Sequence, residues 1–170
     1  MKIMFVSCND HVCVLCRSCL CPMKIMFVSC NDHMTSSENL VSHAGSCHCG
    51  NVKFTVLAPS ILEVWNCNCS ICTKKQNLHF IVPRSRFTLH PDSEEHLTTY
   101  TFNSGQAKHT FCKTCGVQSF YTPRSNTDGV GVMPHCIDSD TVTKVVYRKF
   151  DGQNWEQFIE TSDIRSRSKE

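Results

Sequence analysis

Two groups of cysteines stand out because their spacing suits metal binding. The chain has 14 cysteines in 170 residues. Cys112 and Cys115 are separated by two residues and followed by glycine, as in a zinc knuckle where two thiolates converge on one ion. Such a pair supplies only half of a tetrahedron. We predict that Cys47 and Cys49, which also precede a glycine, supply the other half.

Four thiolates around one ion would form a closed, structural zinc site. The two pairs are about 60 residues apart, so the ion would tie the two ends of a domain together. The alternative is that Cys47 and Cys49 are small buried residues, as free cysteines often are. Their match to a second pair beside glycine favours the ligand interpretation.

Cys67, Cys69 and Cys72 form a second group, with three thiolates and no obvious fourth. Three protein ligands and one open position are typical of a reactive zinc site. Three thiolates make the ion a weak Lewis acid, and an open position on so soft a site suits another thiolate. A thiol substrate would be deprotonated there and held for bond making or breaking at sulfur.

The alternative for this second group is a structural site with a fourth protein ligand. Five residues are candidates for that ligand: Cys136, His48, His79, His109 and His135. Proton transfer near the site could involve His48 or His79, but proximity in sequence is weak evidence of geometry. We therefore assign no catalytic acid or base from the sequence.

Short β-strands must position these cysteines. Val52, Phe54 and Val56 alternate with polar residues, and Leu62 and Val64 continue the alternation, which is typical of half-buried strands. Similar runs occupy residues 80–82, 100–102, 109–111, 117–121, 129–133 and 142–150, and a single helical turn is predicted near residues 71–76. These short strands with cysteine-bearing turns predict a mainly β, antiparallel fold.

Composition bounds the class of protein. Hydrophobic residues make up 41% of the chain and charged residues 19%, as in globular proteins, and no apolar stretch reaches the length of a membrane helix. We expect no membrane partner. The formal net charge of +2 gives no sign of direct nucleic-acid binding, which disfavours a zinc-ribbon nucleic-acid binder. No secretory signal begins the sequence, so we expect an intracellular protein of the cytoplasm or nucleus, with metal-binding cysteines preferred over disulfides.

The N-terminal segment contains a duplication. Residues 1–11 recur without a change at residues 23–33, around a cysteine-rich spacer. Structural repeats normally drift in sequence, so this copy does not indicate a repeat fold. We predict a disordered tail over residues 1–42, one zinc domain over residues 43–162, and a disordered tail over residues 163–170.

The order of the motifs CxCG, CxCxxC and FCxxCG resembles the glutathione-dependent formaldehyde-activating enzyme family, and within it the branch of centromere protein V and its relatives. The resemblance spans roughly residues 43–160 and includes all seven cysteines. It implies antiparallel β-sheets in a tent-like arrangement around two zinc ions per chain. By this resemblance, four of the cysteines hold a structural zinc and the other three hold the zinc that receives the thiol adduct.

The resemblance also implies a function. It indicates a carbon–sulfur lyase that joins glutathione and formaldehyde reversibly into S-hydroxymethylglutathione. Glutathione has two carboxylates, so we predict substrate contacts from Lys74 and Lys75, with Arg84 or Arg124 as weaker candidates; the alternative is a solvated lysine pair. The competing function is a non-catalytic scaffold like centromere protein V, with both zincs structural and a chromatin, kinetochore or cytoskeletal partner.

Overall fold

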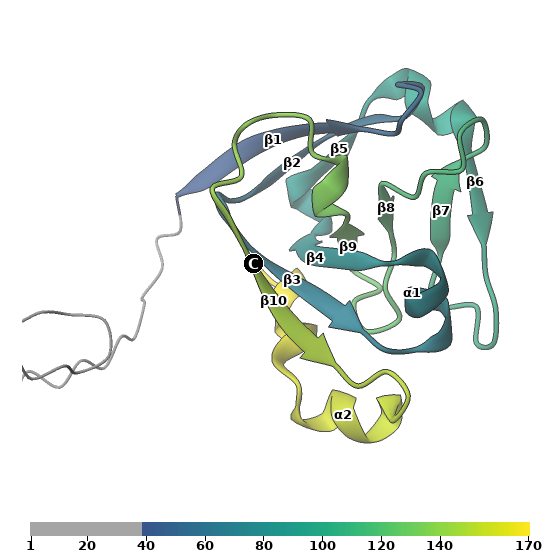
Figure 1. Cartoon of the computed structure of the whole chain (residues 1–170), viewed down its shortest axis with the longest axis vertical. Coiled ribbons are helices and arrows are strands. Elements are labelled where there is room, and N and C mark those ends of the chain that lie inside the picture. The colour runs from purple at the N-terminus through teal and green to yellow at the C-terminus, as the bar shows by residue number, and fades with distance from the viewer. Residues whose placement is uncertain (1–38) are drawn as a thin grey trace, which may run out of the picture. The chain divides into compact units, whose positions relative to one another are not determined.

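The computed structural model describes residues 39–170, which fold as strands in three sheets with short helices between them (Figure 1). One sheet has the strand order β1 (Leu40–Ser46), β2 (Lys53–Pro59), β5 (Phe87–Leu89). The largest has the order β10 (Lys144–Phe150), β3 (Ile61–Cys67), β4 (Leu78–Pro83), β9 (Gly129–Val132), β8 (Phe120–Tyr121). Strands β6 (Leu97–Tyr100) and β7 (His109–Cys112) form a separate pair.

The helices are short and connect or follow the strands. The two α-helices are α1 (Ser70–Lys75) and α2 (Trp155–Thr161). The 3-10 turns are η1 (Arg84–Arg86), η2 (Pro91–His96), η3 (Pro134–Cys136) and η4 (Asp163–Ser168). None of the helices in residues 39–170 has the length and apolar character needed to cross a membrane.

The prediction of a mainly β, antiparallel fold is confirmed. Every strand pairing is antiparallel except that of β10 with β3, where Phe150 lies opposite Cys67. The alternation read in the sequence is visible in β2, where Phe54, Val56 and Ala58 are buried and their neighbours are not. The parallel pairing of β10 with β3 brings the chain that follows β10 close to the second cysteine group.

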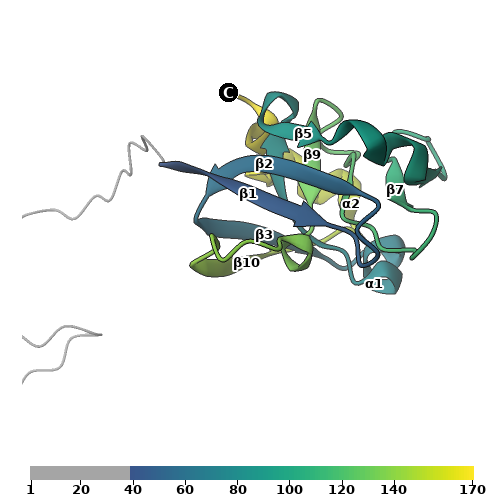
Figure 2. The same ribbon diagram turned by 90° about the horizontal axis from the view of Figure 1, so that it is seen from above.

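The main core lies between the two larger sheets, which form separate layers in Figures 1 and 2. Its centre contains Phe54, stacked on Phe87 with ring centroids 5.5 Å apart. A smaller core packs α2 and η4 against strands β3, β4 and β10 of the large sheet. Its buried members are Trp65, Ile81, Phe150, Ile159 and Ile164.

The structure differs from the sequence predictions in three places. Strand β1 begins at Leu40, inside the predicted tail, and residues 1–38 lie outside the described part of the chain. Helix α2 was not predicted. The predicted disorder of residues 163–170 is wrong for residues 163–168, because η4 buries Ile164 in the smaller core and Ser168 against Asn126, whose Nδ2 donates to the Ser168 hydroxyl at 2.8 Å.

Candidate metal centres and cavity

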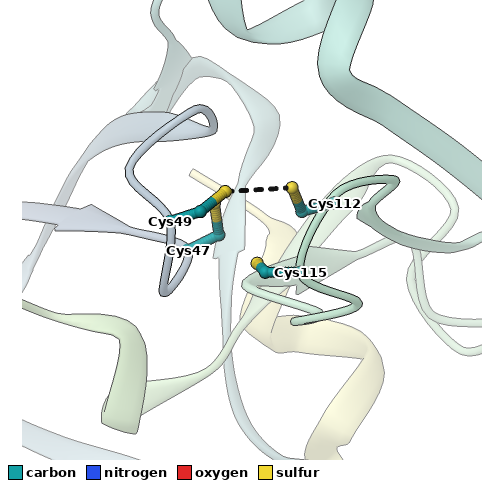
Figure 3. A group of neighbouring side chains, drawn as sticks. All are labelled: Cys47, Cys49, Cys112 and Cys115. Atoms are coloured by element: carbon teal, nitrogen blue, oxygen red, sulfur yellow. Dashed lines mark hydrogen bonds between the residues drawn. The ribbon is translucent and has the colours of Figure 1, made fainter.

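The first cysteine group is built from two similar turns, each closed by a bond from the first cysteine N–H to the carbonyl five residues on: Cys47 to Val52 at 2.9 Å and Cys112 to Val117 at 3.0 Å. Inside the turns, Gly50 donates its N–H to the carbonyl of Cys47, three residues back, and Gly116 donates to that of Cys112, four residues back, both at 2.9 Å. Both glycines have positive φ, 78° and 75°, a conformation that favours glycine. Each turn therefore points two thiols at the other turn, as Figure 3 shows.

The geometry of this group fits a tetrahedral thiolate site. The four Sγ atoms of Cys47, Cys49, Cys112 and Cys115 lie within 4.8 Å of one another. The Sγ of Cys49 is 3.5 Å from that of Cys47 and 3.6 Å from that of Cys112. Zinc–sulfur bonds of about 2.3 Å in a tetrahedron place sulfurs about 3.8 Å apart. A zinc-sized ion would fit this group with little movement.

The thiols of this group share protons through hydrogen bonds, which shifts their pKa values in opposite directions. A bound cation would remove this competition for protons. Burial raises the pKa of Cys115, but backbone N–H groups and neighbouring thiols outweigh it and lower the pKa to about 6. The backbone N–H of Asn51 lowers the pKa of Cys49, yet burial and the three neighbouring thiols raise it to about 12. A divalent cation would replace the shared protons and favour the thiolate form of all four.

The second group is assembled within six residues. Cys67 ends β3, Cys69 is the N-cap of α1, and Cys72 is the buried residue of that helix. Their Sγ atoms also lie within 4.8 Å of one another. Hydrogen bonds from the thiols of Cys67 and Cys72 lower the pKa of Cys69 to about 2, while hydrogen bonds with Cys67 and Cys69 raise the pKa of Cys72.

The loop after β10 holds this second group in place. Asn68 donates from Nδ2 to Asp151 at 3.0 Å, and Gln153 donates its N–H to the side-chain oxygen of Asn68 at 3.0 Å. A Cβ on Gly152 would lie 2.4 Å from the Sγ of Cys67, so no larger residue fits without displacing the thiol. No cysteine spacing could reveal this support, because it comes from about 85 residues away.

The second group opens onto a cavity of about 440 Å³, and the four cysteines of the first group are not among the residues that line it. Aromatic and apolar side chains form much of the wall, together with three serines, Asn103 and Gln153. The titratable or charged side chains of the wall are Cys67, Cys69, Cys72, His79, His109, Tyr121 and Arg124. A molecule in this cavity would therefore meet the three thiols directly.

The comparison with known proteins agrees with this arrangement. A sequence model described as glutathione-dependent formaldehyde-activating enzyme matches residues 42–153. The chain belongs to this family. A crystal structure of a Rhodobacter sphaeroides protein is similar to it, with a TM-score of 0.52 and 28% identity over 62% of this chain and 99% of that one. The matched segment of this family member contains all seven grouped cysteines.

The structure of this formaldehyde-activating enzyme family member shows which candidates for a fourth ligand lie on the cavity wall with the three thiols. Within residues 39–170, no other Cys, His, Asp or Glu joins the three thiols within 4.8 Å. His48 and His135 are exposed, and Cys136 is buried in the main core, where burial raises its pKa. Only His79 and His109 line the cavity.

His79 is already engaged by the protein. Its Nδ1 lies 3.4 Å from the carbonyl of Asn77 and its Nε2 lies 2.9 Å from the hydroxyl of Tyr121. A carbonyl only accepts, so Nδ1 carries the proton and Nε2 accepts from Tyr121. Burial lowers the pKa of His79 to about 4, consistent with a neutral ring.

The predicted substrate lysines lie outside the cavity. Lys74 is exposed, and the Nζ of Lys75 lies 4.7 Å from the centre of the Phe111 ring. The cation that lines the cavity is Arg124, which lies 3.6 Å over the ring of Trp155 and pairs with Glu156. Arg84 lies by Phe87 and a different surface hollow. The structure thus favours Arg124, a weaker candidate from the sequence.

Proposed function

We propose that this protein is a zinc-dependent carbon–sulfur lyase that joins and separates glutathione and formaldehyde as S-hydroxymethylglutathione. The main support for this proposal is that three thiols lie together on the wall of a cavity, in a member of the glutathione-dependent formaldehyde-activating enzyme family. A closed group would need a fourth protein ligand, and the described residues offer none within reach. An open position beside a cavity is where a substrate sulfur can enter.

The two donor sets support the proposal of two zinc ions per chain. Cys47, Cys49, Cys112 and Cys115 would hold a structural ion, and the three thiols of the cavity wall would hold the second. When bound, the second ion would supply acidity that keeps a substrate thiol in its thiolate form at neutral pH. The chain contributes the fixed positions of the three ligands, supported by Asn68 and Gly152.

The cavity suits a peptide thiol. Its volume of about 440 Å³ lies within the range of small-molecule sites, about 300–1,000 Å³. Arg124 can bind a substrate carboxylate, because its guanidinium has five donors and the pair with Glu156 uses only Nη2. Ser125 and Gln153, also on the wall, offer further polar contacts to a peptide backbone.

The reaction is balanced without an oxidant or reductant. The thiolate sulfur adds to the carbonyl carbon of formaldehyde, the carbon–oxygen π bond breaks, and the oxygen takes up a proton to give the hydroxymethyl thioether. In the lyase direction the hydroxyl loses its proton, the carbon–sulfur bond breaks, and formaldehyde leaves. The protein must therefore position a sulfur, hold the small aldehyde beside it and exchange one proton.

An intracellular location, in the cytoplasm or nucleus, is part of the same proposal. All eight cysteines of residues 39–170 are free, which suits a reducing compartment where glutathione is abundant. Membership of the centromere protein V branch and the scaffold alternative, with chromatin or cytoskeletal partners, stay predictions. That alternative needs four fixed protein ligands at the second group.

Zinc quantification combined with X-ray absorption tests the proposal. We expect two zinc ions per chain, and a fourth sulfur at about 2.3 Å from the second ion when glutathione is added. Exchange among glutathione, formaldehyde and their adduct, followed by NMR, should exceed the uncatalysed rate. S-methylglutathione has no ionisable thiol and should bind much more weakly. A two-zinc protein that neither binds millimolar glutathione nor accelerates exchange would contradict the lyase and favour the scaffold.

A further inference from the structure

His109 occupies a defined place in the cavity wall. It is the first residue of β7 and is 2% exposed. Its ring stacks between two others: the ring centroid of Phe102 is 5.8 Å away at 27°, and that of Tyr121 is 5.1 Å away at 15°. A side chain held on both faces has its orientation fixed before a substrate arrives, which is the preorganisation that proton transfer needs.

The other titratable groups of the wall are unsuited to exchanging a proton with a substrate. Both nitrogens of His79 are engaged, and the Tyr121 hydroxyl donates to one of them. Burial raises the pKa of Tyr121 far above 10, and Arg124 stays charged at all relevant pH. No Asp or Glu lines this cavity, and the three thiols are the candidate metal ligands.

The two nitrogens of His109 differ in their surroundings. Nδ1 is enclosed and lacks a well-aligned partner, and so does the Oε1 of Gln118. The Gln118 side chain lies close enough to His109 to affect its pKa by hydrogen bonding. A proton on Nδ1 would give both enclosed atoms a partner after a small side-chain adjustment. Nε2, which is not among the enclosed atoms without a partner, is then the basic nitrogen of a ring that lines the cavity.

We propose that His109 is the catalytic residue that exchanges the proton of the substrate hydroxyl through its Nε2, an inference that rests on the proposed lyase function. In the lyase direction the hydroxyl proton of S-hydroxymethylglutathione passes to Nε2 and the electron pair of the O–H bond forms the carbonyl. The carbon–sulfur bond breaks with its electron pair on sulfur, so that formaldehyde and the glutathione thiolate are the products. In synthesis the imidazolium returns that proton to the oxygen as the sulfur adds to carbon.

The charge around His109 suits this role. Burial and then the positive charge of Lys75 lower its pKa below 6.5, whereas hydrogen bonding by Gln118 and the charge of Cys69 act in the opposite direction. Tyr121 on β8 stacks on His109 and His79 on β4 interacts with it electrostatically, and the tyrosine stays neutral. Cys67, Cys72 and Arg124 are the other titratable or charged side chains of the wall. A neutral imidazole at pH 7 is a base, so lyase turnover should fall as the pH drops through the His109 pKa.

The test compares full-length zinc-loaded variants. His109→Gln cannot shuttle a proton, His109→Phe keeps the aromatic stack, and His90→Gln is a control at an exposed histidine whose side chain contacts Thr55. We expect both His109 variants to keep two zincs and to bind glutathione within threefold of wild type. Their exchange rate should fall at least 100-fold, as is typical when a general acid–base is removed, while the control keeps its rate.

Two further readouts separate chemistry from packing. The loss of lyase rate below pH 6.5 should be present in wild type, at constant zinc content, and absent from the residual activity of His109→Gln. Added imidazole should restore part of the activity of His109→Ala. If His109→Phe stays within threefold of wild type, or if the variants lose zinc in proportion to activity, the role of His109 is structural and our inference is wrong. A wild type without binding or exchange would overturn the proposed function as well.

Discussion

The two cysteine groups use the same ligand chemistry in opposite structural settings. The first joins the β1–β2 turn to the turn after β7, so its thiols come from residues up to 68 positions apart, Cys47 and Cys115. The second is formed inside the six residues from Cys67 to Cys72. A distant closure stabilises a fold because it restricts much chain, and a local one restricts little.

The surroundings of the two cysteine groups also differ. The first group has four thiols and does not line the cavity, while the second has three and lies on the cavity wall, with Gly152 leaving space for the thiol of Cys67. The number of thiols and their access to a cavity thus vary together. This difference is what distinguishes a structural site from a reactive one when both are built from cysteine alone.

The largest expected effect is on stability when the first group loses a ligand. Structural zinc contributes on the order of 10 kcal/mol to folding, comparable to the whole stability of a domain. We therefore expect Cys112→Ser to lose its cooperative thermal transition. Cys72→Ser should keep a cooperative transition, measured by circular dichroism, and one zinc. Similar unfolding of the two variants would remove the distinction between the sites.

A smaller effect, confined to the second group, is expected from Gly152→Ala. The added Cβ would lie within 2.4 Å of the Cys67 Sγ and 2.8 Å of the Cys69 Cβ, so the thiols must shift. Disturbing the support of a metal ligand typically lowers metal affinity 10- to 100-fold. Competition with a chelator should show one weakened and one unchanged zinc. The first site is the internal control, and equal weakening of both would indicate a general loss of fold.

The strands and the cysteine groups could be predicted from the sequence, but the side chains around the second group could not. Alternation at residues such as Phe54 and Val56 revealed strands because one face of each sheet is buried. The cysteine pairs were visible because a knuckle needs short spacing and glycine. By contrast, Arg124, Gly152 and Trp155 line the same cavity as the second group because β10 pairs with β3 in parallel and Arg124 packs over Trp155 of α2. Such contacts leave no local pattern.

The predictions for the cavity side chains and for the C-terminal segment both rested on local sequence. Lys74 and Lys75 are near Cys72 in sequence, but neither is among the residues that line the cavity, so their contact with substrate stays a prediction. The segment after residue 162 looks solvated because it is rich in Arg and Ser, although its single apolar residue, Ile164, completes the smaller core. One buried side chain is too weak a signal to see in a sequence.

Recognition of the substrate should depend on the cavity side of the molecule. A hydrogen bond to a charged group contributes about 1.5 kcal/mol, so Arg124→Gln should weaken glutathione binding roughly tenfold in calorimetry, with zinc content unchanged. Lys74→Gln is the matched control because that lysine is exposed and does not line the cavity. If the lysine variant weakens binding and the arginine variant does not, the assignment must return to the lysines.

The smallest effect is expected from removing residues 1–38. This segment carries six of the 14 cysteines, and the seven grouped ones all lie in the part that remains. Because both ligand sets are complete without it, the shortened protein should bind the same two zincs. Its Tm should stay within about 4 °C of the full chain, the shift that about 1 kcal/mol would produce. The deletion must stop at residue 38, since β1 begins at Leu40 and leads directly into Cys47. Loss of one zinc on deletion would show that a cysteine of the first 38 residues completes a site, and the three-thiol group would then no longer count as open.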